Sequence, residues 1–259
     1  MEKQQLIKKI TQKKEFSKLP KKDVELAFEQ FNKGKYLDEE KIKLTRDLLR
    51  RVFSAFTSLK LLSLKNKDEE WILKKHFSTR ERLPYYKKLY EQLLNDFELG
   101  KKLTVIDLGA GVNGFSYKFL KEVKHNLDYV GIEAVGQLVE LTNNYFIKNN
   151  IKGIVYHESL FDLEKIKSII KKIKTQKVIF LFKTLDSLEM LERNYSKKLI
   201  LEIIDLADRI IVSFATRSMV KKTKFKVNRE WIINFIKDNF NMLDDFELGS
   251  ERYIVFCKK

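Results

Sequence analysis

The chain has 259 residues, enough for a core domain together with an accessory domain. Hydrophobic residues make up 44% of the sequence and aromatic residues 12%, which is sufficient for a packed core and excludes global disorder. Lysine and arginine total 52 against 36 aspartates and glutamates, giving a net charge of +16. Such an excess of positive charge favours polyanionic partners such as nucleic acids. The net charge alone fits equally well with lysines and arginines that only contact solvent.

Cysteine and histidine usage excludes several classes of site. The single cysteine, Cys257, permits no disulfide framework. The three histidines, His76, His125 and His157, are scattered, so we expect no metal centre. No apolar run has the length of a membrane span, and residues 1–5 are not typical of a signal peptide. We therefore predict a cytoplasmic protein without a membrane partner, and we expect a monomer.

The first part of the chain is expected to be helical. Residues 1–98 contain one glycine and no alternating strand pattern. Apolar residues between 42 and 56 recur at three- and four-residue spacing, while Arg50 and Arg51 fall off that stripe. We predict a basic helical domain over residues 1–85 that serves as a docking module. The alternative is that its charges only keep it solvated.

The second part, residues 86–259, is expected to be an α/β domain. Short apolar runs alternate there with amphipathic segments, which predicts a mainly parallel sheet with helices on both faces. The expected strands are 103–108, 127–132, 153–156, 178–182, 209–214 and 253–257. The expected helices are 115–123, 137–149, 163–173, 188–207 and 229–240.

The turn after the first expected strand carries the most information. Residues 104–114 form a buried strand that leads into the sequence D-L-G-A-G, which runs from Asp107 to Gly111. Gly109 and Gly111 allow close approach to a ligand, and a first strand-to-helix turn is where doubly wound folds bind nucleotides. A dehydrogenase would have G-x-G-x-x-G instead. The stretch resembles the first motif of Rossmann-like methyltransferases, which implies that Gly109, Ala110 and Gly111 lie beside the methionine part of S-adenosyl-L-methionine.

Two further positions fit such a cofactor. The second strand ends at Glu133, and a carboxylate there accepts hydrogen bonds from both ribose hydroxyls. Ser159, Leu160 and Phe161 follow the third strand, where this fold contacts the adenine, and the sequence does not choose among them. The alternative is that the glycines make a purely structural turn and that Glu133 is an exposed acid.

Several segments resemble one family. Residues 76–83 read H-F-S-T-R-E-R-L, similar to the H-x-S-T-R-E-R-L signature of the Arm/Rmt aminoglycoside-resistance 16S ribosomal RNA methyltransferases, which modify guanine N7. Residues 107–113 resemble the family's D-x-G-x-G-x-N turn, and residues 180–185 its F-L-L-K-x-L strand. Residues 212–218 resemble its S-F-P-T/I-[KR]-[ST] segment. The resemblance covers residues 76–259 well and the helical part more loosely.

The resemblance implies both an activity and the residues that carry it. It implies a Rossmann-like methyltransferase that uses S-adenosyl-L-methionine to methylate a base nitrogen of 16S ribosomal RNA near the decoding region, with guanine N7 as the expected atom. Arg80 is implied to contact the cofactor carboxylate, since a guanidinium matches a carboxylate. The helical part is implied to dock on the small ribosomal subunit. The implied RNA-binding residues are Arg50, Arg51, Arg217, Lys221, Lys222 and Lys224.

No general base is expected for this reaction. The lone pair of guanine N7 is already free, so catalysis consists of positioning and water exclusion. We therefore assign no certain catalytic residue. The candidates for positioning the target base are Phe182, Lys183 and Phe214. A further aromatic residue, Trp231, either stacks on the target base or belongs to the core. Phe182 is also expected at the cofactor.

Three departures from the family pattern leave the target atom open. Gly114 follows Asn113 where the family has proline, Ala215 replaces a proline, and Glu133 replaces an aspartate. The first two changes affect loops near the target base, so methylation of cytidine N4 in 16S ribosomal RNA stays an alternative. A non-catalytic ribosome-assembly factor with a methyltransferase fold is a second alternative.

Overall fold

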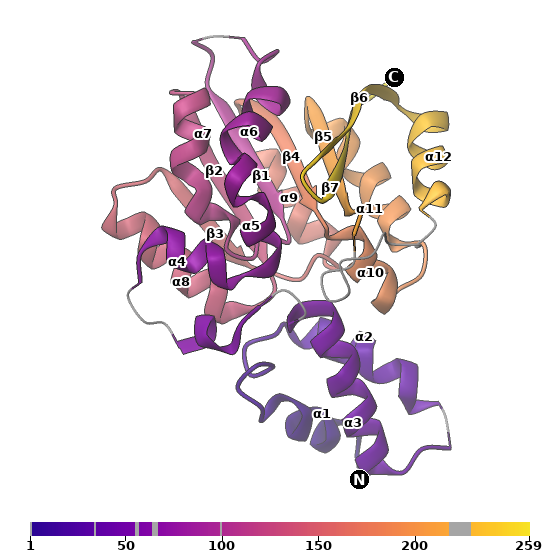
Figure 1. Cartoon of the computed structure of the whole chain (residues 1–259). Helices are drawn as coiled ribbons and strands as arrows, with labels where there is room; N and C mark the ends of the chain where they lie inside the picture. The colour runs from indigo at the N-terminus through magenta and orange to yellow at the C-terminus, as the bar shows by residue number, and fades with distance from the viewer. Residues whose placement is uncertain (1, 34, 55–56, 64–66, 99, 218–228) are drawn as a thin grey trace.

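The computed structural model describes residues 2–33, 35–54, 57–63, 67–98, 100–217 and 229–259. The N-terminal segment folds into helices that form a lobe of their own, which we call the helical unit (Figure 1). Ile10, Phe28 and Leu49 are fully buried in its core. Its elements are α1 (Lys3–Thr11), α2 (Lys21–Asn32), α3 (Asp38–Leu49) and the π-helical turn η1 (Arg50–Ser54).

The next helices belong to the lobe that contains the sheet and not to the helical unit (Figure 1). They are η2 (Leu59–Ser63), α4 (Glu69–Lys75), α5 (Phe77–Arg82), η3 (Leu83–Tyr85) and α6 (Tyr86–Leu94). The Tyr86 ring of α6 stacks on Phe119 with centroids 5.5 Å apart, and Tyr90 stacks on Phe180 of the sheet at 6.2 Å. A division before η2 therefore groups these helices with the sheet, while the expected boundary at residue 85 stays a prediction.

One seven-stranded sheet organises the rest of the chain, with the order β3-β2-β1-β4-β5-β7-β6. Strands β1 to β5 are parallel, and β7 runs antiparallel to both β5 and β6. The strands are β1 (Leu103–Leu108), β2 (Leu127–Glu133), β3 (Gly153–His157), β4 (Gln176–Phe182), β5 (Arg209–Ala215), β6 (Asn241–Leu248) and β7 (Glu251–Cys257). All six expected strands are present, and the predicted α/β fold class is confirmed.

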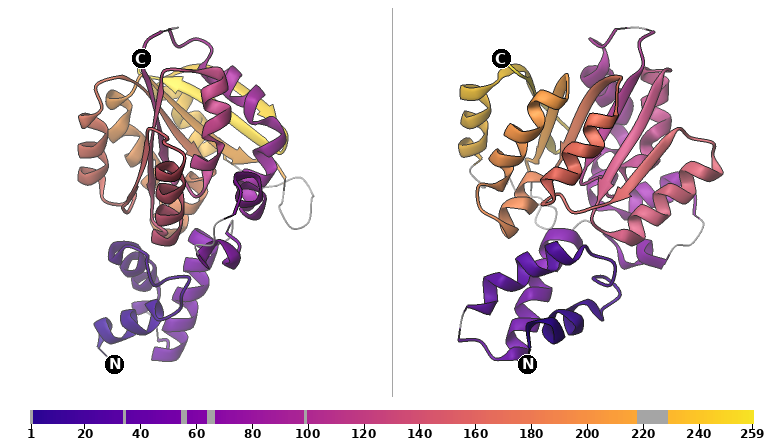
Figure 2. Two further views of the ribbon diagram at one scale, coloured as in Figure 1. Left: turned by 90° about the vertical axis from the view of Figure 1, so that its left-hand side faces the viewer. Right: turned by 180° about the vertical axis from the view of Figure 1, so that it is seen from behind.

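Helices cover both faces of this sheet (Figure 2). They are η4 (Asn113–Ser116), α7 (Tyr117–Val123), α8 (Gly136–Lys148), α9 (Leu163–Lys172), α10 (Leu185–Leu191), α11 (Tyr195–Ile203), η5 (Ile204–Leu206) and α12 (Glu230–Asn239). The single helix expected over residues 188–207 is wrong, because Asn194 has a φ of 64° and separates α10 from α11. Within the described parts of the chain, no helix combines the length and apolarity needed to cross a membrane.

The strand order determines where a ligand site is expected. The crossovers reverse direction between β1 and β4, and such a switch point leaves a crevice at the carboxyl ends of the strands. The helical unit lies across this end of the sheet (Figure 1). Lys22 of α2 donates to the Phe161 carbonyl at 2.6 Å, and Asp23 accepts from Ser159 at 2.5 Å.

Candidate cofactor pocket

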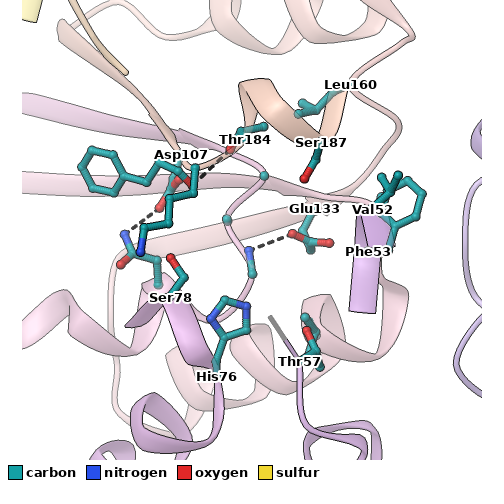
Figure 3. Close-up of a pocket in the computed structure, with 18 of the residues that line it drawn as sticks. Val52, Phe53, Thr57, His76, Ser78, Asp107, Glu133, Leu160, Thr184 and Ser187 are labelled. Carbon is teal, nitrogen blue, oxygen red and sulfur yellow. Dashed lines mark hydrogen bonds between the residues drawn. The ribbon is translucent and has the colours of Figure 1, made fainter. Parts of the chain in front are cut away.

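A pocket opens at the carboxyl ends of β1, β2 and β4 (Figure 3). It encloses about 840 Å³ of space that no protein atom fills, a volume that includes the part open to solvent. The sheet supplies the strand ends and the glycine turn, while the helical unit supplies Asp23, Val52 and Phe53. The pocket therefore lies between the sheet and the helical unit.

The turn after β1 has a backbone that requires glycine. Gly109 and Gly111 have φ values of 78° and 53°, in the left-handed region. A Cβ on Gly109 would stand 2.8 Å from Thr184 Oγ1, and one on Gly111 would stand 3.0 Å from His76 Nε2. The turn is thus confined between His76, which directly precedes α5, and Thr184, which follows β4, and both glycines line the pocket.

Glu133 holds this turn from the neighbouring strand. Its Oε2 accepts from the Gly111 backbone at 2.7 Å (Figure 3). Its Oε1 accepts from the Val135 backbone at 2.8 Å. Burial raises the pKa of Glu133, and these two backbone donors partly offset that effect. Each carboxylate oxygen has two lone pairs, so Glu133 retains acceptor capacity for a ligand in the pocket that it lines.

Asp107 fixes the other side of the turn. Its Oδ2 accepts from Asn113 Nδ2 at 2.7 Å and from the Tyr129 hydroxyl at 2.8 Å. Burial raises the pKa of Asp107, while these two hydrogen bonds oppose the rise. Both expected acids, Asp107 and Glu133, therefore lie in the pocket wall with the expected Gly109, Ala110 and Gly111.

The expected contact of Arg80 with the cofactor is not supported by its position. Arg80 is exposed, with its guanidinium 4.5 Å from the Phe77 ring centroid, and it does not line the pocket. Ser78 and Arg82 line the pocket in its place. Residues 78 and 82 share one face of α5 at a spacing of four, whereas residue 80 points about 200° away from residue 78. The pocket is also lined by His76, Ser78 and Arg82, which were not predicted as site residues.

Lys183 belongs to a buried charge cluster beside the pocket. Glu251 Oε2 accepts from Arg82 Nε and from Lys183 Nζ, each at 3.2 Å, and Lys183 also pairs with Glu81 at 2.5 Å. Burial by itself would raise the pKa of Glu251, but the cations Arg82 and Lys183 outweigh it and hold that pKa below its ordinary value. Two cations and two carboxylates thus balance one another.

The cluster also maintains an unusual backbone at the end of β4. Lys183 has a φ of 57°, a conformation that costs a residue with a side chain about 1–3 kcal/mol. Its backbone nitrogen donates to Ser213 Oγ at 3.0 Å, and its side chain enters the buried ion pairs. As expected, Phe182 and Lys183 both line the pocket.

The loop after β3 contributes two of its three expected residues. Leu160 and Phe161 line the pocket, whereas the Ser159 hydroxyl donates to Asp23 of α2. Burial raises the pKa of Asp23 to about 7, although the hydrogen bond from Ser159 lowers it. Asp23 was not predicted as a site residue, because an acid in the first turn of a helix needs no function beyond helix stabilisation.

The remaining candidates lie away from the pocket. Phe214 is buried beneath the guanidinium of Arg229, 5.2 Å from its ring centroid, and Trp231 is half-buried under Lys197. Neither Phe214 nor Trp231 lines the pocket. Arg51 and Arg217 are exposed, and Lys221, Lys222 and Lys224 lie outside the described residues.

These features identify first a class of protein. A sheet with five parallel strands, an antiparallel β7 between β5 and β6, and an acid–glycine turn after β1 is the Rossmann-like methyltransferase fold. The chain belongs to the ribosomal RNA methyltransferase (FmrO) family, whose model matches residues 33–241. Among curated proteins, none matches the sequence.

Solved structures agree with this assignment. The 16S rRNA methyltransferase RmtF, in complex with S-adenosyl-L-homocysteine, is 20% identical with a TM-score of 0.79 over 100% of both chains. The 16S rRNA methylase RmtB is 18% identical with a TM-score of 0.77 over 100% of this chain and 99% of that chain. An rRNA methylase from Escherichia coli is 17% identical with a TM-score of 0.76 over 99% of each chain.

The comparisons confirm three predictions: the Arm/Rmt resemblance, the Rossmann-like fold and the methyltransferase class of the enzyme. The RmtF complex holds S-adenosyl-L-homocysteine, the demethylated product of the predicted cofactor S-adenosyl-L-methionine. The roles of individual pocket residues stay predictions.

We expect Glu251→Gln to lower the free energy of unfolding by about 3–5 kcal/mol, because an amide leaves Arg82 and Lys183 buried with one carboxylate between them. Urea-induced unfolding measures the change. Glu247→Gln, on the exposed side of β6, is the matched control and should shift stability by less than about 0.5 kcal/mol. Equal, small effects of both substitutions would contradict a structural role for the cluster.

Proposed function

We propose that this protein binds S-adenosyl-L-methionine in the pocket and methylates a base nitrogen of 16S ribosomal RNA near the decoding region, with guanine N7 as the target atom. One observation carries the proposal: Glu133 and the glycine turn lie in a single pocket at the switch point of a ribosomal RNA methyltransferase fold. The solved complex of RmtF with S-adenosyl-L-homocysteine supports the same ligand for this chain.

The pocket residues fit the parts of this cofactor. The backbone of Gly109 and Gly111 leaves no space for a Cβ, which suits close contact with the methionine part. Glu133 retains lone pairs for the ribose hydroxyls. Leu160 and Phe161 supply apolar surface for the adenine. When bound, the cofactor supplies an electrophilic methyl group on a sulfonium.

The charged groups at the β4 side of the pocket favour a nucleophile that needs no deprotonation. Burial, reinforced by Arg82 and Lys183, lowers the pKa of His76 to about 3, so this histidine is neutral and weakly basic at physiological pH. Lys183 is held in ion pairs, and Asp107 accepts two hydrogen bonds. None of these described groups is poised as a general base, which suits the free lone pair of guanine N7. Their role is to shape the pocket and exclude water.

We expect Glu133→Ala and Gly111→Val to weaken binding of S-adenosyl-L-homocysteine at least about 100-fold, since the first removes the ribose acceptor and the second fills the turn. Isothermal titration calorimetry measures the affinity. Glu122→Ala, on the exposed face of α7, is the control and should bind normally. RNA binding by both variants should persist. Normal cofactor affinity in Glu133→Ala would refute this pocket as the cofactor site.

Exposed cations beside the pocket are the proposed RNA contacts. Arg51 directly precedes Val52, which lines the pocket, and it makes no ion pair among the described residues. Arg50 already pairs with Glu15 and Asp47 at 2.8 and 2.9 Å, so part of its charge is compensated. Arg217 is exposed just after β5.

We expect Arg51→Glu, and separately the double substitution of Lys221 and Lys224 to Glu, to weaken binding to small ribosomal subunits while cofactor affinity stays unchanged. Each lost phosphate contact should reduce the slope of log affinity against log salt by about one. Filter binding across a salt series provides the measurement. Lys101→Glu, at the opposite end of the sheet, is the charge-matched control. An unchanged affinity in both test variants would remove this surface from the proposal.

The decisive test of the reaction is to incubate small ribosomal subunits with enzyme and S-adenosyl-L-methionine and to map the product by mass spectrometry. We expect one 16S nucleotide to become N7-methylguanosine. N4-methylcytidine would overturn the proposed target atom but not the enzyme class. Cofactor binding without any methylated nucleotide would overturn the catalytic proposal in favour of an assembly factor.

A further inference from the structure

One buried carboxylate in the pocket wall has no role in the proposed reaction. Asp23, in the first turn of α2, is 1% exposed and lines the pocket. Its Oδ1 accepts from the Ser159 hydroxyl at 2.5 Å. Its Oδ2 is fully buried and accepts no hydrogen bond from any residue that the structure describes. Buried carboxylate oxygens are costly without a donor, so this atom is suited to a donor on a ligand.

The surroundings of Asp23 indicate the shape of that ligand. Leu160, Phe161 and Leu138 are buried apolar side chains of the same pocket. The Phe161 carbonyl already accepts from Lys22, so that loop is held in place by α2. A flat ring with apolar faces and one hydrogen-bond donor at its edge would satisfy both the apolar walls and the carboxylate. Burial raises the pKa of Asp23 to about 7, consistent with a carboxylate that lacks a donor.

We infer that Asp23 Oδ2 accepts a hydrogen bond from the exocyclic amine of the cofactor's adenine, so that the helical unit, and not only the sheet, selects the purine. The inference rests on the proposed function, because it assumes that S-adenosyl-L-methionine occupies this pocket. It assigns to α2 a specificity-determining residue that recognises a 6-amino purine and disfavours a 6-oxo purine. A 6-oxo group presents an acceptor to the carboxylate, and two facing acceptors repel each other.

A purely structural role for Asp23 is separable from this one. Asparagine has the same shape, and its Oδ1 can still accept from Ser159, so Asp23→Asn preserves the link between α2 and the loop after β3. The substitution changes only the group facing the ligand, from an acceptor to the Nδ2 donor. A structural role predicts that this variant treats 6-amino and 6-oxo purines as the wild type does.

The test compares S-adenosyl-L-homocysteine with S-inosyl-L-homocysteine, its 6-oxo counterpart, by calorimetric titration of the full chain at a pH well above the raised pKa of Asp23, where this side chain is a carboxylate that only accepts. We expect the wild type to prefer the adenosyl compound about 10- to 100-fold, and Asp23→Asn to remove or reverse that preference. Asp47→Asn makes the same chemical change on α3, outside the pocket, and should keep the wild-type ratio. Because both ligands are measured on the same sample, partial unfolding of a variant does not alter the ratio.

The outcomes separate the two proposals. If the wild type binds neither compound, the cofactor pocket itself is wrong and the inference falls with it. If the wild type binds S-adenosyl-L-homocysteine but Asp23→Asn keeps the wild-type preference, only the role of Asp23 is overturned. If Asp47→Asn also loses the preference for the adenosyl compound, the cause is the general change in charge, and the proposed role of Asp23 is overturned as well.

Discussion

The site depends on the hydrogen bonds that hold one glycine turn between two buried carboxylates. Glu133 binds the Gly111 backbone from β2, and Asp107 binds Asn113 from β1. The register of β1 against β2 brings both acids to the same end of the sheet. Because a buried carboxylate without donors is costly, these contacts fix the turn and also fix the acids. The ligand pocket is thus prepared by the packing of the sheet and needs no rearrangement of its strands.

The charge cluster beside this turn connects elements that are far apart in sequence. Arg82 comes from α5, Lys183 from the end of β4 and Glu251 from the start of β7. The Ser213 hydroxyl of β5 also donates to Glu251. Breaking one buried pair would leave an uncompensated charge, so the cluster holds α5 against β7 in the antiparallel part of the sheet. It also holds Lys183 in its strained conformation at the rim of the pocket.

The sequence allowed prediction of those parts that depend on local patterns. The strands β1, β4 and β5 are continuous buried apolar runs, and the D-L-G-A-G turn specifies its own backbone. Strand β6 was missed because its residues alternate between exposed and half-buried and include acids, as is common at a protected sheet edge. Whether Arg80 or Arg82 lines the pocket depends on which face of α5 packs against β7, and the local sequence does not determine this face. Asp23 could not be assigned because its partners, Ser159 and the pocket, are distant in sequence.

The distribution of charge has a consequence for the release of product. The chain carries a net charge of +16, but Arg82 and Lys183 in the pocket wall are balanced by Glu81 and Glu251. Asp107 and Glu133 form no ion pair among the described residues, so in their ionised form they make the pocket wall negative, whereas the chain as a whole is positive. In the proposed reaction, transfer of the methyl group converts a cationic sulfonium into a neutral thioether. A negative pocket wall attracts the cationic sulfonium of S-adenosyl-L-methionine but not the neutral thioether of S-adenosyl-L-homocysteine. The loss of this one charge therefore weakens binding of the product and favours its release.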